Sequence, residues 1–269
     1  MLARFIGIPV LLLSLLALLD RRQGRRFPAW LRAWSPGGAI LLMATVALLY
    51  TTPWDNYLVA NRIWWYDPAL VTGVTFGWVP IEEYTFFVVQ TWMTGLWVLT
   101  WARRLAQPDQ PASLPPHRDA GTLPTAARWA PALVASGTWA IWLALLLFGW
   151  QRGLYLAILL TWALPPMVLQ LGFGADILWR HRRLVALGLL PPTLYLWVVD
   201  GLAISGGTWT INPANTVGLN LAGILPLEEA VFFLVTNTLI VFGIVLLLAP
   251  ESHKRVGDFL RAHRSLPTL

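Results

Sequence analysis

The stretches "VPIEEYTFF" at Val79–Phe87 and "LPLEEAVFF" at Leu225–Phe233 decide the fold of this chain. Both read apolar, Pro, apolar, Glu, Glu, two further residues, Phe, Phe, and each opens a long apolar run. Proline costs no hydrogen bond in the first turn of a helix, and the helix dipole favours acidic side chains there. A helix start needs only one acid, so two successive acids in both stretches indicate a function as well.

The composition around these stretches is that of a membrane protein. Of the 269 residues, 57% are hydrophobic and 12% are charged, which is typical of a chain that crosses a bilayer several times. The chain has no cysteine, which excludes disulfides, thiolate catalysis and zinc–thiolate or iron–sulfur sites. Apolar runs predict seven helices, at roughly 5–19, 37–54, 80–101, 129–150, 153–175, 184–202 and 223–248.

Basic residues set the predicted topology. The loops after the first, third and fifth predicted helices and the C-terminal tail hold 16 of the 19 lysines and arginines. Because basic loops stay in the cytoplasm, we expect a multi-pass protein of the inner (cytoplasmic) membrane with its N-terminus outside and its C-terminus in the cytoplasm. This asymmetry accounts for the net charge of +6, and no nucleic-acid partner is expected.

An internal repeat organises the chain. "PWDNYL" followed by "WWYDP" in the first half matches "LWVVDGL" followed by "GTWTINP" in the second. The predicted pairs are Asp55 with Asp200, Trp65 with Trp209, Pro68 with Pro213, Gly77 with Gly223, Glu82 and Glu83 with Glu228 and Glu229, and Phe86 and Phe87 with Phe232 and Phe233. One linking helix between two three-helix units gives both units the same orientation.

The predicted architecture is therefore an all-α integral membrane seven-helix bundle, with two parallel three-helix repeats joined by a linking helix. Residues 1–104 form the first repeat and residues 151–249 the second. A Pro-rich linker plus the linking helix occupies 105–150, and a cytoplasmic tail occupies 250–269.

This plan brings six carboxylates to the outer membrane face, because Asp55 and Asp200 end outward-running helices and both Glu-Glu pairs begin inward-running ones. Adjacent carboxylates in an apolar site repel, so one is expected to keep its proton and act as an acid while its neighbour acts as a base. The candidate catalytic residues are Asp55, Glu82, Glu83, Asp200, Glu228 and Glu229. One shared site and two equivalent sites are both compatible with the sequence.

Aromatic side chains accompany the acids. Each of the four glutamates lies four residues before a phenylalanine, as Glu83 does before Phe87, so an acid is expected beside a ring that stabilises cations without offering a nucleophile. Such parts suit protonation of an apolar alkene, passage through a carbocation and loss of a proton, without a redox cofactor. The candidate substrate-binding residues are Phe86, Phe87, Phe232, Phe233, Trp65, Tyr66, Trp209 and Asn237.

Simpler roles exist for some of these residues. The tryptophans and Tyr66 also suit a membrane-interface belt, and Asn237 also suits a hydrogen bond between helices. No metal site is expected, because His117, His181, His253 and His263 all fall in predicted cytoplasmic loops or the tail.

The doubled Pro-x-Glu-Glu motif with its Phe-Phe, the "PWD" before the first copy and "FFLVTNTL" in the second resemble the membrane-integral, non-flavin lycopene cyclases. The chain resembles the fused form of the heterodimeric bacterial type and the cyclase domain of fungal bifunctional carotenoid enzymes. The resemblance implies closure of the acyclic ends of lycopene to β-ionone rings, giving γ-carotene and β-carotene. It implies no cofactor, and as partners lycopene or a related acyclic carotenoid, the lipid bilayer and other enzymes of carotenoid biosynthesis.

Two other functions remain compatible with the residues: a proton- or ion-coupled membrane carrier and a non-catalytic carotenoid-binding protein. A carrier predicts polar residues along the depth of several helices, whereas "TGLWVLTW" and "IVFGIVLLL" are nearly all apolar. The second motif also departs from the first, since Ala230 replaces Tyr84 and Thr236 replaces Gln90. The two halves are therefore not expected to be fully equivalent.

Overall fold

The computed structural model describes residues 7–25, 27–105 and 125–264 and is mostly helical. Its α-helices are α1 (Ile8–Arg22), α2 (Pro36–Ala60), α3 (Ile81–Leu105), α4 (Thr125–Leu147), α5 (Leu154–Arg180), α6 (Arg182–Ser205), α7 (Leu227–Leu248) and α8 (Pro250–Arg264). Short 3₁₀ turns lie at Ala29–Leu31, Gln151–Gly153 and Pro213–Asn215. The part of the predicted Pro-rich linker at 106–124 lies outside the described residues.

The expectation of seven helices is corrected to eight in the described part of the chain. The additional helix, α8, occupies most of the predicted tail. Its sequence is rich in charged and polar residues, so it carries no long apolar run, and Val256, Phe259 and Leu260 remain exposed on it. Two ion pairs attach it to α5: Arg180 to Glu251 at 3.1 Å and Arg255 to Asp176 at 2.6 Å.

In the described part of the chain, five segments are long and apolar enough to cross a membrane: Ala29–Ala60, Arg128–Leu147, Gln151–Arg180, Arg182–Ser205 and Leu227–Leu248. Helix α1 has 15 residues, fewer than the roughly 20 needed to span. Helix α3 has 25 residues but carries acids in its first turn and Arg103 and Arg104 in its last. Several apolar helices therefore form a bundle that is compatible with a membrane.

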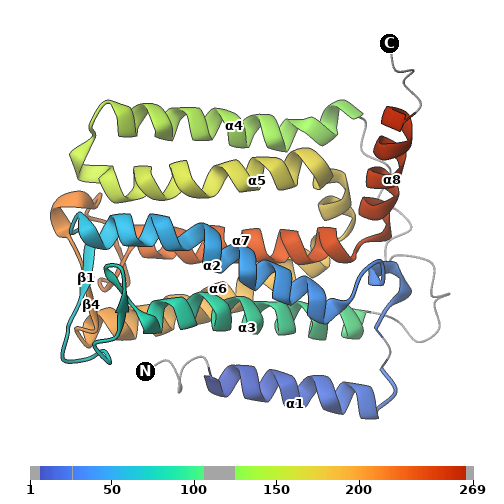
Figure 1. Cartoon of the computed structure of the whole chain (residues 1–269), viewed down its shortest axis with the longest axis horizontal. Helices are drawn as coiled ribbons and strands as arrows, with labels where there is room; N and C mark the ends of the chain where they lie inside the picture. The colour runs from blue at the N-terminus through green and yellow to red at the C-terminus, as the bar shows by residue number, and fades with distance from the viewer. Residues whose placement is uncertain (1–6, 26, 106–124, 265–269) are drawn as a thin grey trace.

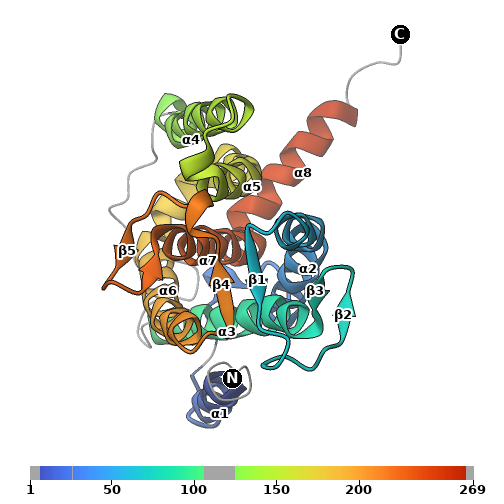
Figure 2. The same cartoon turned by 90° about the vertical axis from the view of Figure 1, so that its left-hand side faces the viewer.

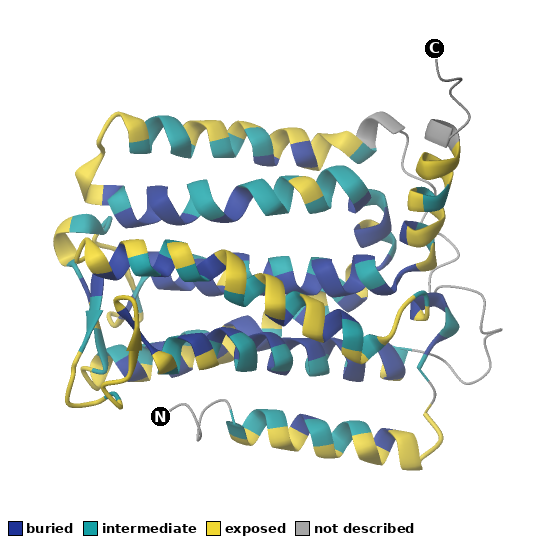
Figure 3. Cartoon of the chain, in the orientation of Figure 1, coloured by how far each residue is buried: buried dark blue, intermediate teal, exposed yellow. Residues whose placement is uncertain are grey.

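Helices α1 to α7 lie nearly side by side along the long axis of the molecule, whereas α8 runs across one end of the bundle (Figure 1). Helix α7 lies in the middle, in contact with α2, α3, α5 and α6, and is buried along most of its length (Figure 3). Helix α4 packs against α5 on one side of the bundle, and α1 packs against α3 on the other. Many large apolar side chains of the peripheral helices point outward, for example Leu133, Val134 and Leu147 of α4, as expected of a surface that faces lipid.

Three small antiparallel ladders, which the sequence did not predict, gather at one end of the bundle (Figure 2). Strand β1 (Trp64–Tyr66) pairs with β4 (Trp209–Ile211). Strands β2 (Thr75–Phe76) and β3 (Val79–Pro80) form one hairpin, and β5 (Asn220–Leu221) and β6 (Leu225–Pro226) form another.

The β1–β4 ladder joins the segment after α2 to the segment after α6. Trp65 lies opposite Thr210 at its centre. Beyond the ladder, the backbone N–H of Asp67 donates to the carbonyl of Thr208 at 3.0 Å, and that of Asn212 donates to Ile63 at 2.9 Å. These bonds fix the ends of α2 and α6 next to each other.

The two hairpins hold the starts of α3 and α7 in the same way. The N–H of Ile81 donates to Val74 at 2.9 Å, and that of Leu227 donates to Leu219 at 2.8 Å. The second hairpin has one more residue in its turn, since Phe76 pairs with Val79 but Leu221 pairs with Leu225. This insertion explains why corresponding residues before the turns differ by 145 (55 to 200) and those after them by 146 (83 to 229).

Candidate active site

One pocket at the β-strand end brings together four carboxyl groups from four helices: Asp55 of α2, Glu83 of α3, Asp200 of α6 and Glu229 of α7. Its remaining lining residues are aromatic or aliphatic: Trp54, Trp64, Phe86, Phe87, Tyr155, Trp209, Ile211, Phe232 and Phe233. The helix ends and the β1–β4 ladder produce this convergence, because they fix the C-terminal parts of α2 and α6 over the first turns of α3 and α7.

Each aspartate is held by an indole. The Trp64 Nε1–H donates to Oδ1 of Asp55 at 3.1 Å, and the Trp209 Nε1–H donates to Oδ1 of Asp200 at 3.0 Å. The two aspartates are 3% and 2% exposed. Both bonds join residues nine positions apart, so the same contact is made twice.

The structure corrects the predicted pairing of Trp65 with Trp209. Trp64 makes the contact that Trp209 makes, and successive side chains of a strand point to opposite faces, so Trp65 points away and does not line the pocket. Tyr66 does not line it either; its hydroxyl donates to the carbonyl of Trp78 at 3.4 Å.

The two glutamates of each adjacent pair point in different directions. Glu83 and Glu229 line the pocket, whereas Glu82 and Glu228 do not. Oε1 of Glu82 accepts the backbone N–H of Thr72 at 2.6 Å, and Oε1 of Glu228 accepts that of Val217 at 2.7 Å. Successive residues of a helix point about 100° apart, so one glutamate of each pair reaches the loop and the other reaches the pocket.

Tyr155, in the first turn of α5, was missed by the sequence analysis. It is buried, and its hydroxyl donates to Oε1 of Glu229 at 2.7 Å. It lies outside the duplicated motif, so the motif gave no signal for it. Among the described residues, no corresponding hydrogen bond to the Glu83 carboxyl is recorded, and the two halves of the pocket therefore differ.

Aromatic rings form most of the pocket wall. Phe86 and Phe233 meet edge to face across the two halves with their centroids 6.0 Å apart, and Phe232 and Phe233 do so at 5.2 Å. The Trp54 ring stacks parallel to Phe232 at 5.8 Å. Trp54 was not a candidate, although it directly precedes Asp55 in the "PWD" motif.

Asn237 lies below the pocket and does not line it. It is fully buried; its amide donates to Thr193 of α6 at 3.1 Å, and its carbonyl accepts from Thr94 of α3 at 2.9 Å and from Gln90 at 3.4 Å. These bonds join three helices, as expected from the alternative role of Asn237 in a hydrogen bond between helices.

Of the residues that the structure describes, no lysine, arginine or histidine lines the pocket. Among the same residues, Oδ2 of both Asp55 and Asp200 is buried without a hydrogen-bond partner. Burying several charges without a cation is costly, so such a pocket must retain protons on some of its carboxyl groups. Within residues 7–25, 27–105 and 125–264, no three or more His, Asp or Glu side chains are grouped so as to hold a metal ion.

Both halves of the chain match one known protein family. The family model described as Lycopene cyclase matches residues 5–101 and 151–248. A lycopene beta-cyclase of Halobacterium salinarum is 40% identical over 219 residues, covering 80% of this chain and 83% of that protein. The bifunctional lycopene cyclase/phytoene synthases of Gibberella fujikuroi and Leptosphaeria maculans are 37% and 38% identical; the matches cover 77% and 76% of this chain but 34% and 35% of theirs. No solved structure matches the chain.

Proposed function

Because the chain belongs to the lycopene cyclase family, we propose that it closes the acyclic ends of lycopene to β-ionone rings, giving γ-carotene and then β-carotene. The observation that carries this proposal is the single pocket in which Asp55, Glu83, Asp200 and Glu229 meet inside an aromatic wall. Proton donors, proton acceptors and cation-stabilising rings are then within reach of one end of a polyene.

Glu83 is the proposed proton donor. It lines the pocket, and within the described residues no hydrogen bond to its carboxyl group favours the ionised form. A neutral carboxylic acid in an apolar site is a proton donor of useful strength. Transfer of its proton to the terminal double bond of lycopene leaves a tertiary carbocation on the polyene and a carboxylate on Glu83.

The aromatic wall is proposed to protect that cation. Phe86, Phe87, Phe232 and Phe233 offer ring faces and edges but no nucleophile, and a ring face attracts a cation by its quadrupole. With water excluded, the cation is attacked by the nearby double bond of the same chain, and the six-membered ring closes.

Glu229 is the proposed base. The hydrogen bond from the Tyr155 hydroxyl favours its carboxylate form. Loss of a ring proton to this carboxylate restores a double bond, so one proton is added, one is removed and no electrons leave the substrate. Asp55 and Asp200, each held by an indole, are proposed to return a proton from the base to the acid between turnovers.

Glu82 and Glu228 are proposed as positioning residues. Each carboxylate binds a backbone N–H of the loop that precedes its own helix, and each lies in the first turn, where the helix dipole favours negative charge. They fix the loops around the pocket without contact with the reacting atoms.

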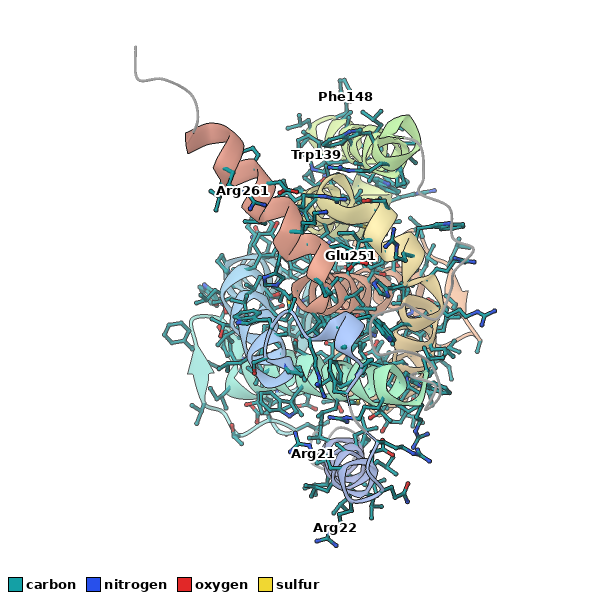
Figure 4. The ribbon with its side chains drawn as sticks, turned by 90° about the vertical axis from the view of Figure 1, so that its right-hand side faces the viewer. Arg21, Arg22, Trp139, Phe148, Glu251 and Arg261 are labelled. Atoms are coloured by element: carbon teal, nitrogen blue, oxygen red, sulfur yellow. The ribbon has the colours of Figure 1, made fainter. Side chains whose placement is uncertain are left out.

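The membrane arrangement is part of the proposal. We propose that α1 to α7 form two parallel three-helix repeats joined by α4, with the boundaries expected from the sequence. The repeated order of helices and hairpins and the paired bonds at the two loops support this. The C-terminal end of α1, which carries Arg21 and Arg22, and helix α8, which carries Arg261, lie at the end away from β1 and β4 (Figure 1); Figure 4 views the molecule from that end. This supports a cytoplasmic position for that end, an outer-face position for the pocket and an outside N-terminus in the inner membrane.

The proposal is tested by pigment chromatography of a lycopene-accumulating bacterial host that expresses the wild-type chain, Glu83→Gln, Glu229→Gln or Glu251→Gln. Wild type and Glu251→Gln, whose change lies on α8 far from the pocket, are expected to yield ring-closed carotenes. The two pocket variants are expected to leave lycopene. Lycopene that persists with wild type would contradict the proposal and favour a carotenoid-binding or carrier function.

A further inference from the structure

A second, apolar groove begins where the acid pocket ends. It is lined by side chains of α2, α3, α5 and α7, among them Ala47, Tyr50, Trp162 and Leu239, and it shares Phe87 and Phe232 with the pocket. The two spaces therefore adjoin at these two rings. The groove runs from Phe232 towards Ile240, eight residues along α7, or roughly 12 Å.

The lining of this groove suits a hydrocarbon. None of its side chains is charged. Three of its hydroxyl and amide donors are used inside the protein: Thr91 donates to the carbonyl of Phe87 at 2.8 Å, Thr236 to that of Phe232 at 2.8 Å, and Gln170 to that of Leu239 at 2.9 Å. An apolar chain in the groove therefore leaves these hydrogen bonds intact.

The outer side of the groove is a seam between α2 and α5, which lie on neighbouring sides of α7 (Figure 2). Tyr50 and Trp162 bridge this seam with stacked rings 5.3 Å apart. The Tyr50 hydroxyl donates to the carbonyl of Trp162 at 2.9 Å, and the Trp162 indole donates to the carbonyl of Tyr50 at 3.4 Å. Tyr50 is 41% exposed, so the bridge is at the molecular surface.

A line of rings leads from this bridge to the acids. Trp162 stacks on Trp54 at 4.4 Å, and Trp54 stacks on Phe232 at 5.8 Å. Trp54 lines the acid pocket and Trp162 lines the groove. Flat rings in series present a smooth apolar surface along which a planar conjugated chain can move.

We propose that this groove binds the conjugated chain of the substrate and that the α2–α5 seam, closed by Tyr50 and Trp162, is the lateral entrance from the bilayer. The inference rests on the proposed function, since it takes the polyene as the occupant. One end of the polyene reaches Glu83 and Glu229 while the chain lies in the groove. The second end reaches the same acids only after the molecule has left and re-entered in the opposite direction.

The groove is tested by filling it. Ala47→Phe places a ring in the groove, whereas the control Thr45→Phe places the same ring on an exposed face of α2. Two readouts are used: the cyclisation rate, and the lycopene retained by purified protein in a Glu83→Gln background that does not turn over. We expect Ala47→Phe to lower both at least about tenfold, and Thr45→Phe to change both by less than about twofold.

The two readouts separate this inference from the proposed function. Lycopene retention does not need turnover, so it decides on the groove even if wild type forms no rings. If Ala47→Phe retains as much lycopene and cyclises it as fast as its parent protein, the proposed binding of the polyene in the groove is wrong. A third outcome is possible: wild type forms no rings, but Ala47→Phe still lowers lycopene retention. This outcome would support the groove and contradict the proposed cyclisation.

The entrance is tested by cross-linking, which the absence of cysteine makes selective. Tyr50→Cys with Trp162→Cys allows a bifunctional thiol reagent to tie α2 to α5. Trp139→Cys with Thr161→Cys ties α4 to α5 at a contact where the Trp139 indole donates to Thr161 at 3.1 Å. We expect the first cross-link to stop lycopene uptake relative to the same protein before the reagent is added, and the second to leave uptake unchanged. Equal uptake before and after the first cross-link would overturn the lateral entrance.

Discussion

The Tyr155 hydroxyl donates a 2.7 Å hydrogen bond to Oε1 of Glu229 from the first turn of α5. This bond distinguishes two halves in which the indole–aspartate pairs and the loop-binding glutamates are repeated. It distinguishes the two glutamates of the pocket and is the basis for treating Glu83 as the acid and Glu229 as the base.

Tyr155→Phe keeps the ring and removes only this bond. A hydrogen bond to a charged group contributes about 1.5–3 kcal/mol, so we expect the cyclisation rate to fall on the order of tenfold or more. Initial rates of ring formation in membranes measure this. Tyr66→Phe, which removes a hydroxyl outside the pocket, is the control; equal rates for the two variants would contradict the role of Tyr155.

Glu83→Gln and Glu82→Gln are expected to differ although the residues are adjacent. Loss of a general acid costs roughly 100-fold or more in rate, so Glu83→Gln should leave lycopene unchanged. Gln at position 82 still offers an oxygen to the Thr72 N–H and loses only the charge near the helix start, which is worth about 0.3–1 kcal/mol. Initial rates and thermal unfolding of the purified variants measure both effects; a greater rate loss in Glu82→Gln would contradict the assignment.

Trp64→Phe and Trp65→Phe test the corrected pairing of the halves. Removing the Trp64 indole leaves Asp55 without its recorded hydrogen bond in a buried site, which costs on the order of 1–3 kcal/mol. We expect the cyclisation rate to fall about tenfold or more for Trp64→Phe and less than about twofold for Trp65→Phe. Rates of purified protein, compared at equal folded amounts, decide between the two positions.

The burial of His181 predicts that the stability of the protein depends on pH. It lies between α5 and α6, is 3% exposed and stacks on Trp30 with centroids 5.1 Å apart. Burial lowers its pKa from 6.5 to about 4; Arg180 acts in the same direction and Glu251 opposes it. The unfolded chain therefore binds a proton between these values that the folded protein does not.

The neutral, buried ring of His181 contributes fully to the stability of the folded protein above pH 6.5, and this contribution is lost as the pH falls towards 4. We expect His181 to lower the free energy of unfolding on the order of 3 kcal/mol over this interval. Unfolding temperatures of wild type and His181→Phe between pH 7 and pH 4 test this. Phe keeps an aromatic ring against Trp30 and does not titrate, so its curve should be flatter; two parallel curves would contradict the assignment.

Much of the site was readable from the sequence because duplication repeats its signals. The order of Asp55 and Glu83 recurs, with one extra residue between the two acids, at Asp200 and Glu229, and all four line one pocket. The predicted partner of Trp209 was wrong by one position because Trp64 and Trp65 are adjacent and offer two alignments. Helix α8 was missed because its many charged and polar residues leave no long apolar run.

The sequence by itself determined the apolar helices, the doubled acidic motif and the membership of both halves in one family, since these depend on composition and local spacing. Only the tertiary structure decided which glutamate of each pair faces the pocket, because that depends on helix rotation relative to its neighbours. It also decided the contact of Tyr155 with Glu229, 74 residues away in the chain, and the seam between Tyr50 and Trp162. Contacts between distant segments are fixed by packing, which no local pattern of residues records.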